Sequence, residues 1–261
     1  MPARLVLFTA LLFAIPGNVM AQGVQTGFLD RTVDVAGQSF RYQVYVPSNY
    51  AQVERWPVIL FLHGAGERGS DGLLPTAVGL GAAIRLDATR YPAIVVFPQV
   101  PRDSQWISVP GEAAMSALDQ TMNEFSTDPD RVYLTGLSMG GRGAWYLAYR
   151  HPERFAAVVP ICGWVSADRS PAWRGAVVPA EDGEPFAALT RRLGKLPVWI
   201  FHGEVDAAVS VEESRKAAAA LESAGADVRY TEFLGVNHNS WDPAFASPEF
   251  SAWLFAQRRK S

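Results

Sequence analysis

Short, continuous runs of apolar residues recur along the chain and predict strands that are covered on both faces. Such runs are typical of parallel sheets, whose two faces are packed against helices. They occupy residues 58–62, 93–97, 132–135, 156–161, 198–201 and 228–233. Residues 40–46 instead alternate apolar and polar positions, which predicts a half-exposed strand. We expect residues 32–36 to pair with this strand as an antiparallel lead-in.

Helical patterns lie between these runs. Apolar residues at near-helical spacing predict helices over residues 111–125, 139–151, 211–224 and 248–257, with a shorter helix near residues 186–193. Gly225 follows the third helix as a stop signal, and Ser247 with Pro248 forms a helix start for the fourth. The alternation predicts an α/β fold with an open, mostly parallel central sheet, helices on both faces and an antiparallel N-terminal lead-in.

Residues 166–182 fit neither pattern. They are rich in Pro, Ala, Arg and Gly, and Trp173 lies among them. We expect this segment to leave the sheet as an excursion over one edge.

The first residues stand apart from the rest of the chain. Arg4 precedes an apolar run over residues 5–15, Pro16 and Gly17 interrupt it, and VMA at residues 19–21 supplies small residues for cleavage. This layout is typical of a secretory signal peptide, and the run is short for a membrane span. We expect a signal peptide at residues 1–21, one domain at residues 22–261, no membrane span in the mature chain, and a secreted or periplasmic location. The alternative is an uncleaved N-terminal anchor.

Composition and charge restrict the classes of partner. The 261 residues, 49% of them hydrophobic, suffice for one large core. The formal net charge is −3 with no run of like charges, so neither nucleic acid nor an anionic membrane surface is expected as a partner. The single cysteine, Cys162, excludes an internal disulfide, and its apolar neighbours predict a buried, inert thiol. The four histidines and this cysteine form no ligand set, so no metal or cofactor is expected.

One motif carries candidate chemistry. GLSMG at residues 136–140 is a G-x-S-x-G pattern between a predicted strand and a predicted helix. Glycines two residues either side of a serine permit a sharp, strained turn that exposes its Oγ, and the following helix favours developing negative charge. Ser138 is therefore the candidate nucleophile. The alternative is a glycine-rich turn with a passive serine.

A serine nucleophile needs a base, and the base needs a carboxylate. Among the four histidines, His238 follows the last predicted strand and every plausible acid, which fits the chain order serine, acid, histidine. His202 still lies at a strand end, ahead of any candidate acid. Glu204 and Asp206 both follow that strand. Asp206 lies further into the loop, ahead of the helix expected from residue 211, and is the favoured acid, with Glu204 as the alternative.

An oxyanion intermediate requires preorganised N–H donors. Met139, directly after the nucleophile, is expected to supply one. The second is expected from the turn HGAGE at residues 63–67, with Ala65 preferred and Gly64 next. His63 is then structural, its ring bonded to the loop backbone.

The ordered set of motifs resembles bacterial secreted α/β-hydrolases. It consists of HGAGERG at residues 63–69, GLSMGG at 136–141, HG at 202–203 with Asp206, and HNSWD at 238–242. Such proteins are labelled predicted peptidases or phospholipase/carboxylesterase-like proteins, and they are similar to feruloyl and acetylxylan esterases and to polyhydroxybutyrate depolymerase-like esterases. The similarity spans residues 39–256. It implies the α/β-hydrolase fold, a triad of Ser138, Asp206 and His238, and oxyanion donors at Met139 and Ala65.

The resemblance also bears on substrates. Trp106 and Trp241 look like the aromatic residues that flank the pocket in such enzymes, although either is alternatively ordinary core. Residues 166–184 depart from the pattern, because relatives often have a much shorter loop there, and this leaves the shape of the acyl pocket open.

Three classes of function remain. The first is a carboxylic ester hydrolase acting on small or polysaccharide-linked acyl or phenolic esters. The second is a peptidase, although the chain lacks the propeller domain that gates peptides in prolyl-oligopeptidase-type enzymes. The third is a non-catalytic binding protein on a hydrolase fold.

Overall fold

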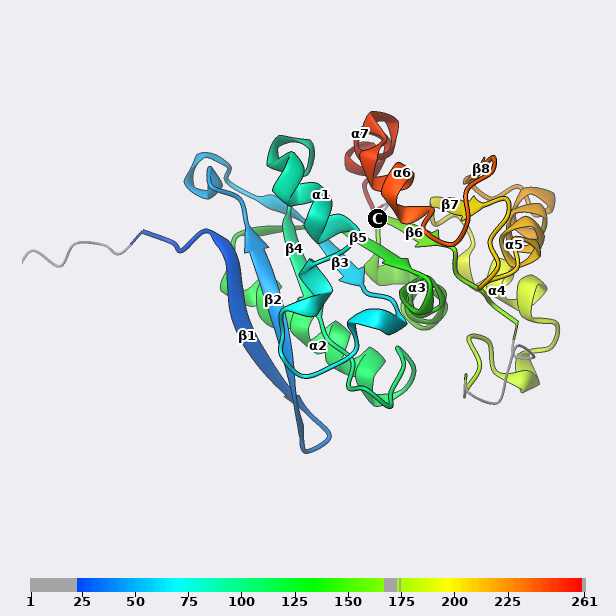
Figure 1. The fold of residues 1–261 in the computed structure, drawn as a ribbon, viewed down its shortest axis with the longest axis horizontal. Helices are drawn as coiled ribbons and strands as arrows, with labels where there is room; N and C mark the ends of the chain where they lie inside the picture. The colour runs from blue at the N-terminus through cyan, green and yellow to red at the C-terminus, as the bar shows by residue number, and fades with distance from the viewer. Residues whose placement is uncertain (1–22, 167–172, 174, 260–261) are drawn as a thin grey trace, which may run out of the picture.

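The computed structural model describes residues 23–166, 173 and 175–259. Its centre is an eight-stranded sheet in the order β1-β2-β4-β3-β5-β6-β7-β8 (Figure 1). The strands are β1 (Gly27–Val35), β2 (Gln38–Val46), β3 (Trp56–Leu62), β4 (Ile94–Pro98), β5 (Thr127–Leu137), β6 (Ala157–Ile161), β7 (Val198–Gly203) and β8 (Val228–Phe233). From β4 to β8 all neighbouring strands are parallel, whereas β1 with β2 and β2 with β4 pair antiparallel. The predicted fold class is confirmed.

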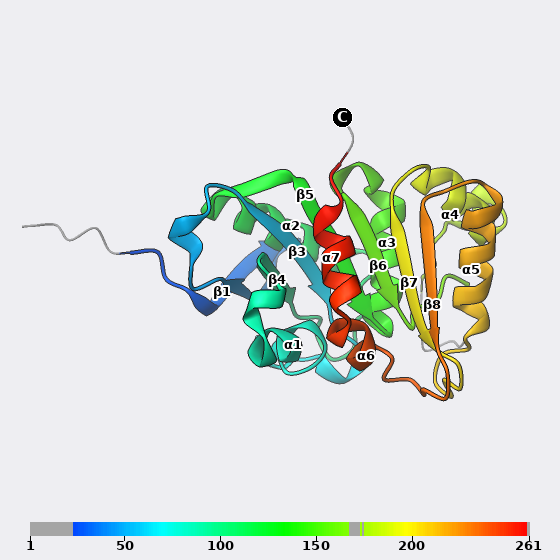
Figure 2. The same cartoon turned by 90° about the horizontal axis from the view of Figure 1, so that it is seen from above.

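Helices cover both faces of this sheet (Figure 2). They are α1 (Leu80–Leu86), α2 (Val109–Glu124), α3 (Met139–Arg150), α4 (Pro185–Leu193), α5 (Glu212–Ser223), α6 (Trp241–Ala246) and α7 (Pro248–Ala256). Side chains of α2, α3, α4 and α5 build the apolar core on one face. Those of α1, α6 and α7 build a second core on the other face. The strands β3, β4, β6 and β7 are buried on both faces, as their continuous apolar runs predicted. The same prediction was wrong for residues 228–233, because β8 lies at the edge of the sheet and is only partly buried.

Two predicted helix ends agree with the capping found. Ser247 caps α7, its Oγ accepting from the Phe250 N–H at 3.3 Å, with Pro248 as the first helical residue. Gly225 follows the end of α5 with a φ of 65°, a left-handed conformation that glycine adopts without strain. The sequence therefore encoded these boundaries locally.

Other elements differ from expectation. The C-terminal half of β2 is buried on both faces rather than one, because Tyr45 packs against Phe28 of β1 at 5.1 Å between ring centroids. The short helices α1 and α6 were not predicted. α1 has only seven residues, of which Leu80, Gly81 and Ile84 are buried, too few for a clear helical period.

The parallel strands share one carboxyl edge, and this edge gathers the candidate chemistry. Ser138 follows β5, Asp206 follows β7 and His238 follows β8. Because β5, β6, β7 and β8 are consecutive neighbours in the sheet, loops far apart in sequence meet there.

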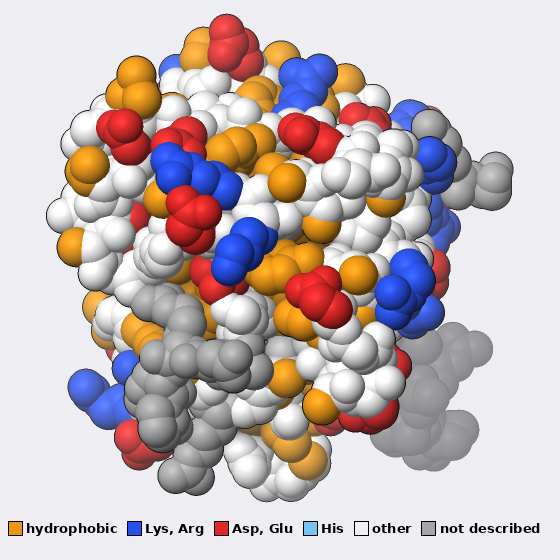
Figure 3. Space-filling model, turned by 90° about the vertical axis from the view of Figure 1, so that its right-hand side faces the viewer, with side chains coloured by type: hydrophobic (Ala, Val, Ile, Leu, Met, Phe, Trp, Pro, Cys, Tyr) orange, Lys and Arg blue, Asp and Glu red, His pale blue; other side chains and the backbone are white. Residues whose placement is uncertain are grey.

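The remaining surface is mixed in charge. Figure 3 shows basic and acidic side chains interspersed on the face that carries α4, α5 and β8. Arg215 on this face pairs with Glu212 at 2.6 Å and with Glu232 at 2.5 Å. The segment expected to be a signal peptide lies outside the described residues. Within the described part of the chain, no helix is long and apolar enough to cross a membrane.

Candidate active site

Ser138 occupies a strained turn between β5 and α3. Its φ of 52° and ψ of −116° lie in a region that residues other than glycine rarely adopt, at a cost of about 1–3 kcal/mol. The Ser138 N–H donates to the Ile161 carbonyl at 2.9 Å, which ties the turn to the end of β6. The side chain is partly exposed above the carboxyl edge of the sheet.

The glycines of the motif are required by close backbone approach. A Cβ on Gly136 would lie 2.3 Å from the carbonyl oxygen of Gly140. A Cβ on Gly140 would lie 1.9 Å from the carbonyl oxygen of Leu62 in β3. Only glycine at both positions lets the turn around Ser138, the nucleophile elbow, lie this close to β3 and to the start of α3.

Ser138, His238 and Asp206 form one hydrogen-bonded chain. His238 Nε2 lies 2.8 Å from Ser138 Oγ, and His238 Nδ1 lies 2.7 Å from Asp206 Oδ2. Since a carboxylate only accepts, the proton is assigned to Nδ1, and the Nε2 lone pair faces the serine hydroxyl. The His238 side chain is 26% exposed, so it can be reached from solvent, whereas that of Asp206 is fully buried.

The alternative acid, Glu204, lies elsewhere. It accepts a hydrogen bond from the Gly235 N–H at 2.9 Å and is exposed. The structure therefore brings Asp206, and not Glu204, to the histidine.

The environment of Asp206 keeps its carboxyl ionised. Burial raises its pKa, but hydrogen bonds from His202 and His238 and from the Val209 N–H outweigh this effect and hold the pKa well below its usual range. The Ala208 and Val209 N–H groups each donate to Oδ1 at 2.8 Å. The carboxylate is thereby a permanent anion beside His238.

The sequence did not predict a contact between His202 and Asp206. His202 Nε2 lies 3.2 Å from Asp206 Oδ2, the oxygen that also receives the His238 hydrogen bond. The sequence placed His202 at a strand end ahead of the acid, and only that proximity along the chain hinted at a contact.

Cys162 also lies beside the triad. Ligand atoms of Cys162, Asp206 and His238 lie within 4.8 Å of one another, the one such cluster among the described residues. Burial raises the pKa of the Cys162 thiol to about 12, and both Asp206 oxygens already accept hydrogen bonds. A protonated thiol and an occupied carboxylate make a poor ligand set for a metal ion.

The candidate oxyanion donors lie at the start of α3 and in the turn after β3. Met139 and Ala65 are the first residues of α3 and of a 3₁₀ turn (Ala65–Glu67), so neither N–H has a partner within its own helix. His63 supports this turn: its Nδ1 donates to the Gly64 carbonyl at 2.6 Å, and its Nε2 accepts from the Val100 N–H at 3.0 Å. Burial lowers the pKa of His63 to about 4, which keeps the ring neutral.

The two candidate pocket tryptophans occupy different places. Trp106 is 1% exposed, and its indole N–H donates to the His63 carbonyl at 2.9 Å, which places it in the core beneath the turn. This is the alternative that the sequence had left open for it. Trp241 is partly exposed and packs edge-on against the His238 ring at 5.4 Å.

The segment after β6, predicted to leave the sheet from residue 166, is held at its start by hydrogen bonds to α5. Glu213 of α5 is buried, and its carboxylate accepts from the Val165 N–H at 3.0 Å and from the Ser166 N–H at 3.1 Å. Residues 167–172 and 174 lie outside the described part of the chain.

A buried cation holds the far side of this excursion. Arg142 of α3 donates to Gln105 Oε1 at 2.5 Å and to the Gly175 carbonyl, and its guanidinium lies 5.4 Å from the Trp164 ring. Burial lowers the pKa of Arg142 to about 10. The nucleophile helix is thus joined to the segment that departs most from the expected pattern.

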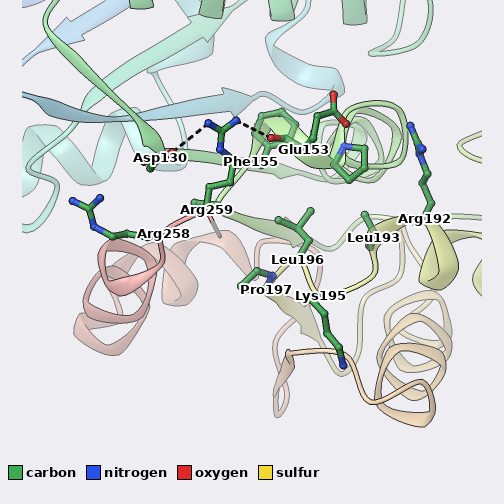
Figure 4. A pocket seen from close by; sticks show the side chains of 12 residues that line it. Asp130, Glu153, Phe155, Arg192, Leu193, Lys195, Leu196, Pro197, Arg258 and Arg259 are labelled. Carbon is green, nitrogen blue, oxygen red and sulfur yellow. Dashed lines mark hydrogen bonds and ion pairs between the residues drawn. The ribbon is translucent and has the colours of Figure 1, made fainter. Parts of the chain in front are cut away.

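A separate hollow lies at the amino ends of the strands, where Asp130, Ala156 and Pro197 line it. Its cations diverge in Figure 4: Arg259 points to Asp130, whereas Lys195 points away from it. The Lys195 ammonium donates to the Gly225 carbonyl at 2.9 Å. Because the triad lies at the carboxyl edge, this hollow is not part of the same site.

Comparison with known proteins agrees with the fold. The family model described as "Putative esterase" matches residues 34–247. NocK of Nocardia uniformis subsp. tsuyamanensis, a protein described as an esterase, is 31% identical over 189 residues, covering 67% of this chain and 48% of that protein. Acetylxylan esterase A of Aspergillus fumigatus, a name given as probable, is 25% identical over 229 residues, covering 76% of this chain and 59% of that protein.

A solved structure extends the comparison. The crystal structure of a thermostable esterase matches with a TM-score of 0.76 at 33% identity, covering 89% of this chain and 63% of that chain. The chain spans about half the length of these two curated relatives. The family match covers most of the sequence, and the chain therefore belongs to this esterase family and has the α/β-hydrolase fold.

Proposed function

We propose that this protein hydrolyses carboxylic esters through a serine triad of Ser138, His238 and Asp206. The observation that carries the proposal is the continuous chain from Ser138 Oγ to His238 Nε2 at 2.8 Å and from His238 Nδ1 to Asp206 Oδ2 at 2.7 Å. Nucleophile and base are within hydrogen-bond reach, and a third group orients the base.

The reaction follows from this geometry. Ser138 Oγ attacks the acyl carbon while its proton passes to His238 Nε2. The tetrahedral adduct collapses and expels the alcohol, which takes that proton from His238. Water then loses a proton to His238 and attacks the acyl-enzyme, which releases the carboxylic acid and restores the Ser138 hydroxyl.

The oxyanion of the adduct is assigned to the N–H groups of Met139 and Ala65. The N-terminal end of α3 carries a partial positive charge, which stabilises negative charge at Ser138. The loss of one such donor typically costs about 3 kcal/mol of transition-state stabilisation.

The side of the site that receives the alcohol is set by His238. Because the histidine protonates the leaving oxygen, the alcohol lies beside it, next to Trp241. Trp241 also lines a groove between α1 and α6, together with Ala82 and Phe245. An aromatic wall of this kind suits a phenolic or sugar alcohol, and the similarity to an acetylxylan esterase agrees with an acyl group on a polysaccharide.

Location is proposed from the sequence. The charged start, apolar run and small-residue cleavage site of residues 1–21 support export, with cleavage near Ala21. Expression of the full chain, followed by N-terminal sequencing of the exported protein, tests both export and the cleavage position.

A substrate panel tests the function. It comprises p-nitrophenyl esters of increasing acyl length, methyl ferulate, acetylated xylan and peptide amides, assayed with wild type, Ser138→Ala and the exposed control Ser210→Ala. We expect ester hydrolysis by wild type and Ser210→Ala, and a loss of at least ~10³-fold in Ser138→Ala with unchanged folding. Cleavage of amides but not esters would favour the peptidase, and no turnover of either would favour a binding protein.

A further inference from the structure

His202 is a second histidine in contact with the candidate catalytic acid. It is buried near the end of β7, and its Nε2 lies 3.2 Å from Asp206 Oδ2 and 3.1 Å from the Val209 carbonyl oxygen. Its Nδ1 lies 2.7 Å from Ser214 Oγ on α5. Both ring nitrogens are therefore occupied, by groups from two different elements.

These partners determine the tautomer. Nε2 faces two oxygens that only accept, a carbonyl and an ionised carboxylate, so it must carry the proton. Nδ1 then accepts from the Ser214 hydroxyl, which can donate. The opposite tautomer would point the Nε2 lone pair at both oxygens, which is repulsive in a site from which water is excluded.

With His202 included, every position around the carboxylate is filled. Oδ1 of Asp206 accepts from the Ala208 and Val209 N–H groups. Oδ2 accepts from His238 and from His202. Two donors on each oxygen prevent the carboxylate from rotating away from His238.

We propose that His202 is a positioning residue that acts through Asp206, extending the triad to a chain of Ser138, His238, Asp206, His202 and Ser214. The inference rests on the proposed function of Ser138 as nucleophile. As a neutral donor, His202 holds Oδ2 in line with His238 Nδ1. It also withdraws negative charge from Oδ2, so that the proton stays on His238 Nδ1 during the reaction.

Three titratable groups lie around His202. Glu232 of β8 is paired with it in the sheet register, but this carboxylate is bound to Arg215 at 2.5 Å, and that hydrogen bond lowers the pKa of Glu232 to about 2. Asp206 faces Nε2, and on the strand side Cys162 carries a protonated thiol near Asp206.

The experiment compares His202→Leu, His202→Gln and Ser214→Ala with wild type. Leucine removes both ring contacts, glutamine places an amide N–H near the position of Nε2, and Ser214→Ala removes only the support of Nδ1. Rates are read both from ester turnover and from labelling by a fluorophosphonate. In the labelling reaction Ser138 Oγ attacks phosphorus and displaces fluoride while its proton passes to His238, so it needs the triad but no ester. Folding is checked by thermal unfolding.

We expect His202→Leu to lower kcat and the labelling rate by roughly tenfold or more with little change in KM, because the catalytic carboxylate loses its alignment. The acid limb of both pH profiles should move to higher pH, since Oδ2 then bears more negative charge beside His238. His202→Gln should recover most of the rate, and Ser214→Ala should lie between.

A folded His202→Leu variant with the wild-type rate and the wild-type pH profile would overturn the proposal. If His202→Leu does not fold, His202→Gln and Ser214→Ala decide. A wild-type rate and an unshifted acid limb of the pH profile in Ser214→Ala, together with a rate far below wild type in His202→Gln, would likewise overturn the proposal. Wild type that labels at Ser138 but cleaves no ester would refute the proposed function while the labelling rates still test His202.

Discussion

Gly140 approaches β3 so closely that a Cβ atom there would lie 1.9 Å from the carbonyl oxygen of Leu62 and 2.7 Å from that of His63. Both obstacles are backbone atoms of a central strand and of the turn that follows it, and they cannot rotate aside as a side chain would. The same approach brings the nucleophile turn against the turn that carries Ala65.

Gly140→Ala is therefore expected to be severely destabilising, with a loss on the order of 4 kcal/mol in the free energy of unfolding. Urea denaturation followed by fluorescence measures it. Gly66→Ala is the matched control, since no atom lies within 4 Å of a Cβ there, and it should change stability by less than ~0.5 kcal/mol. Equal stability of the two variants would show that the elbow relaxes, contrary to the argument.

The two candidate acids are separated by mutation. Asp206→Asn is expected to lower kcat by several orders of magnitude, because an amide no longer selects the His238 tautomer with its proton on Nδ1. Glu204→Gln should retain activity within a few-fold, since the hydrogen bond found for the Glu204 carboxylate among the described residues is to the Gly235 N–H and not to His238. Steady-state kinetics of the two purified variants provides the measurement, and the reverse order would assign the acid to Glu204.

The pH dependence of kcat/KM should have one acid limb. His238 must be neutral to accept the Ser138 proton, so activity rises as pH increases and the ring loses its proton. Hydrogen bonds outweigh burial and hold the pKa of Asp206 well below its usual range, so Asp206 stays ionised throughout and contributes no second limb. Initial rates from about pH 5 to about pH 9 should give a limiting slope of one. A slope of two would mean that the acid titrates with the base.

His63 makes the stability depend on pH. Burial lowers its pKa to about 4 in the folded protein, against 6.5 for the unperturbed ring. Between these values the unfolded chain binds more protons, so stability is lost as pH falls from about 6.5 toward 4, by about 2 kcal/mol between pH 7 and pH 5. His63→Gln, which keeps one donor and one acceptor but does not titrate, should remove this part of the dependence. Unfolding free energies of both proteins at the two pH values test it, and parallel curves would contradict it.

Local patterns in the sequence determined much of this protein. Burial on both faces of a strand forces a continuous apolar run, so the parallel strands were predictable from residues such as those of β3 and β6 alone. A serine held in a turn with positive φ needs glycine at fixed spacing, so the nucleophile elbow around Ser138 could also be predicted from the sequence. The chain order of Ser138, Asp206 and His238 then followed from strand positions.

The tertiary structure decided what depends on contacts between distant segments. Glu204 and Asp206 occupy one loop; the sequence favoured Asp206, but the packing of this loop against the loop after β8 decided which carboxylate contacts His238. The contact of His202 with Asp206, the burial of Trp106 beneath the turn after β3 and the second buried face at Tyr45 are likewise set by neighbours that no local period encodes. A residue's own neighbours along the chain fix its secondary structure and its face, whereas its chemical partners depend on how the loops converge at the carboxyl edge of the sheet.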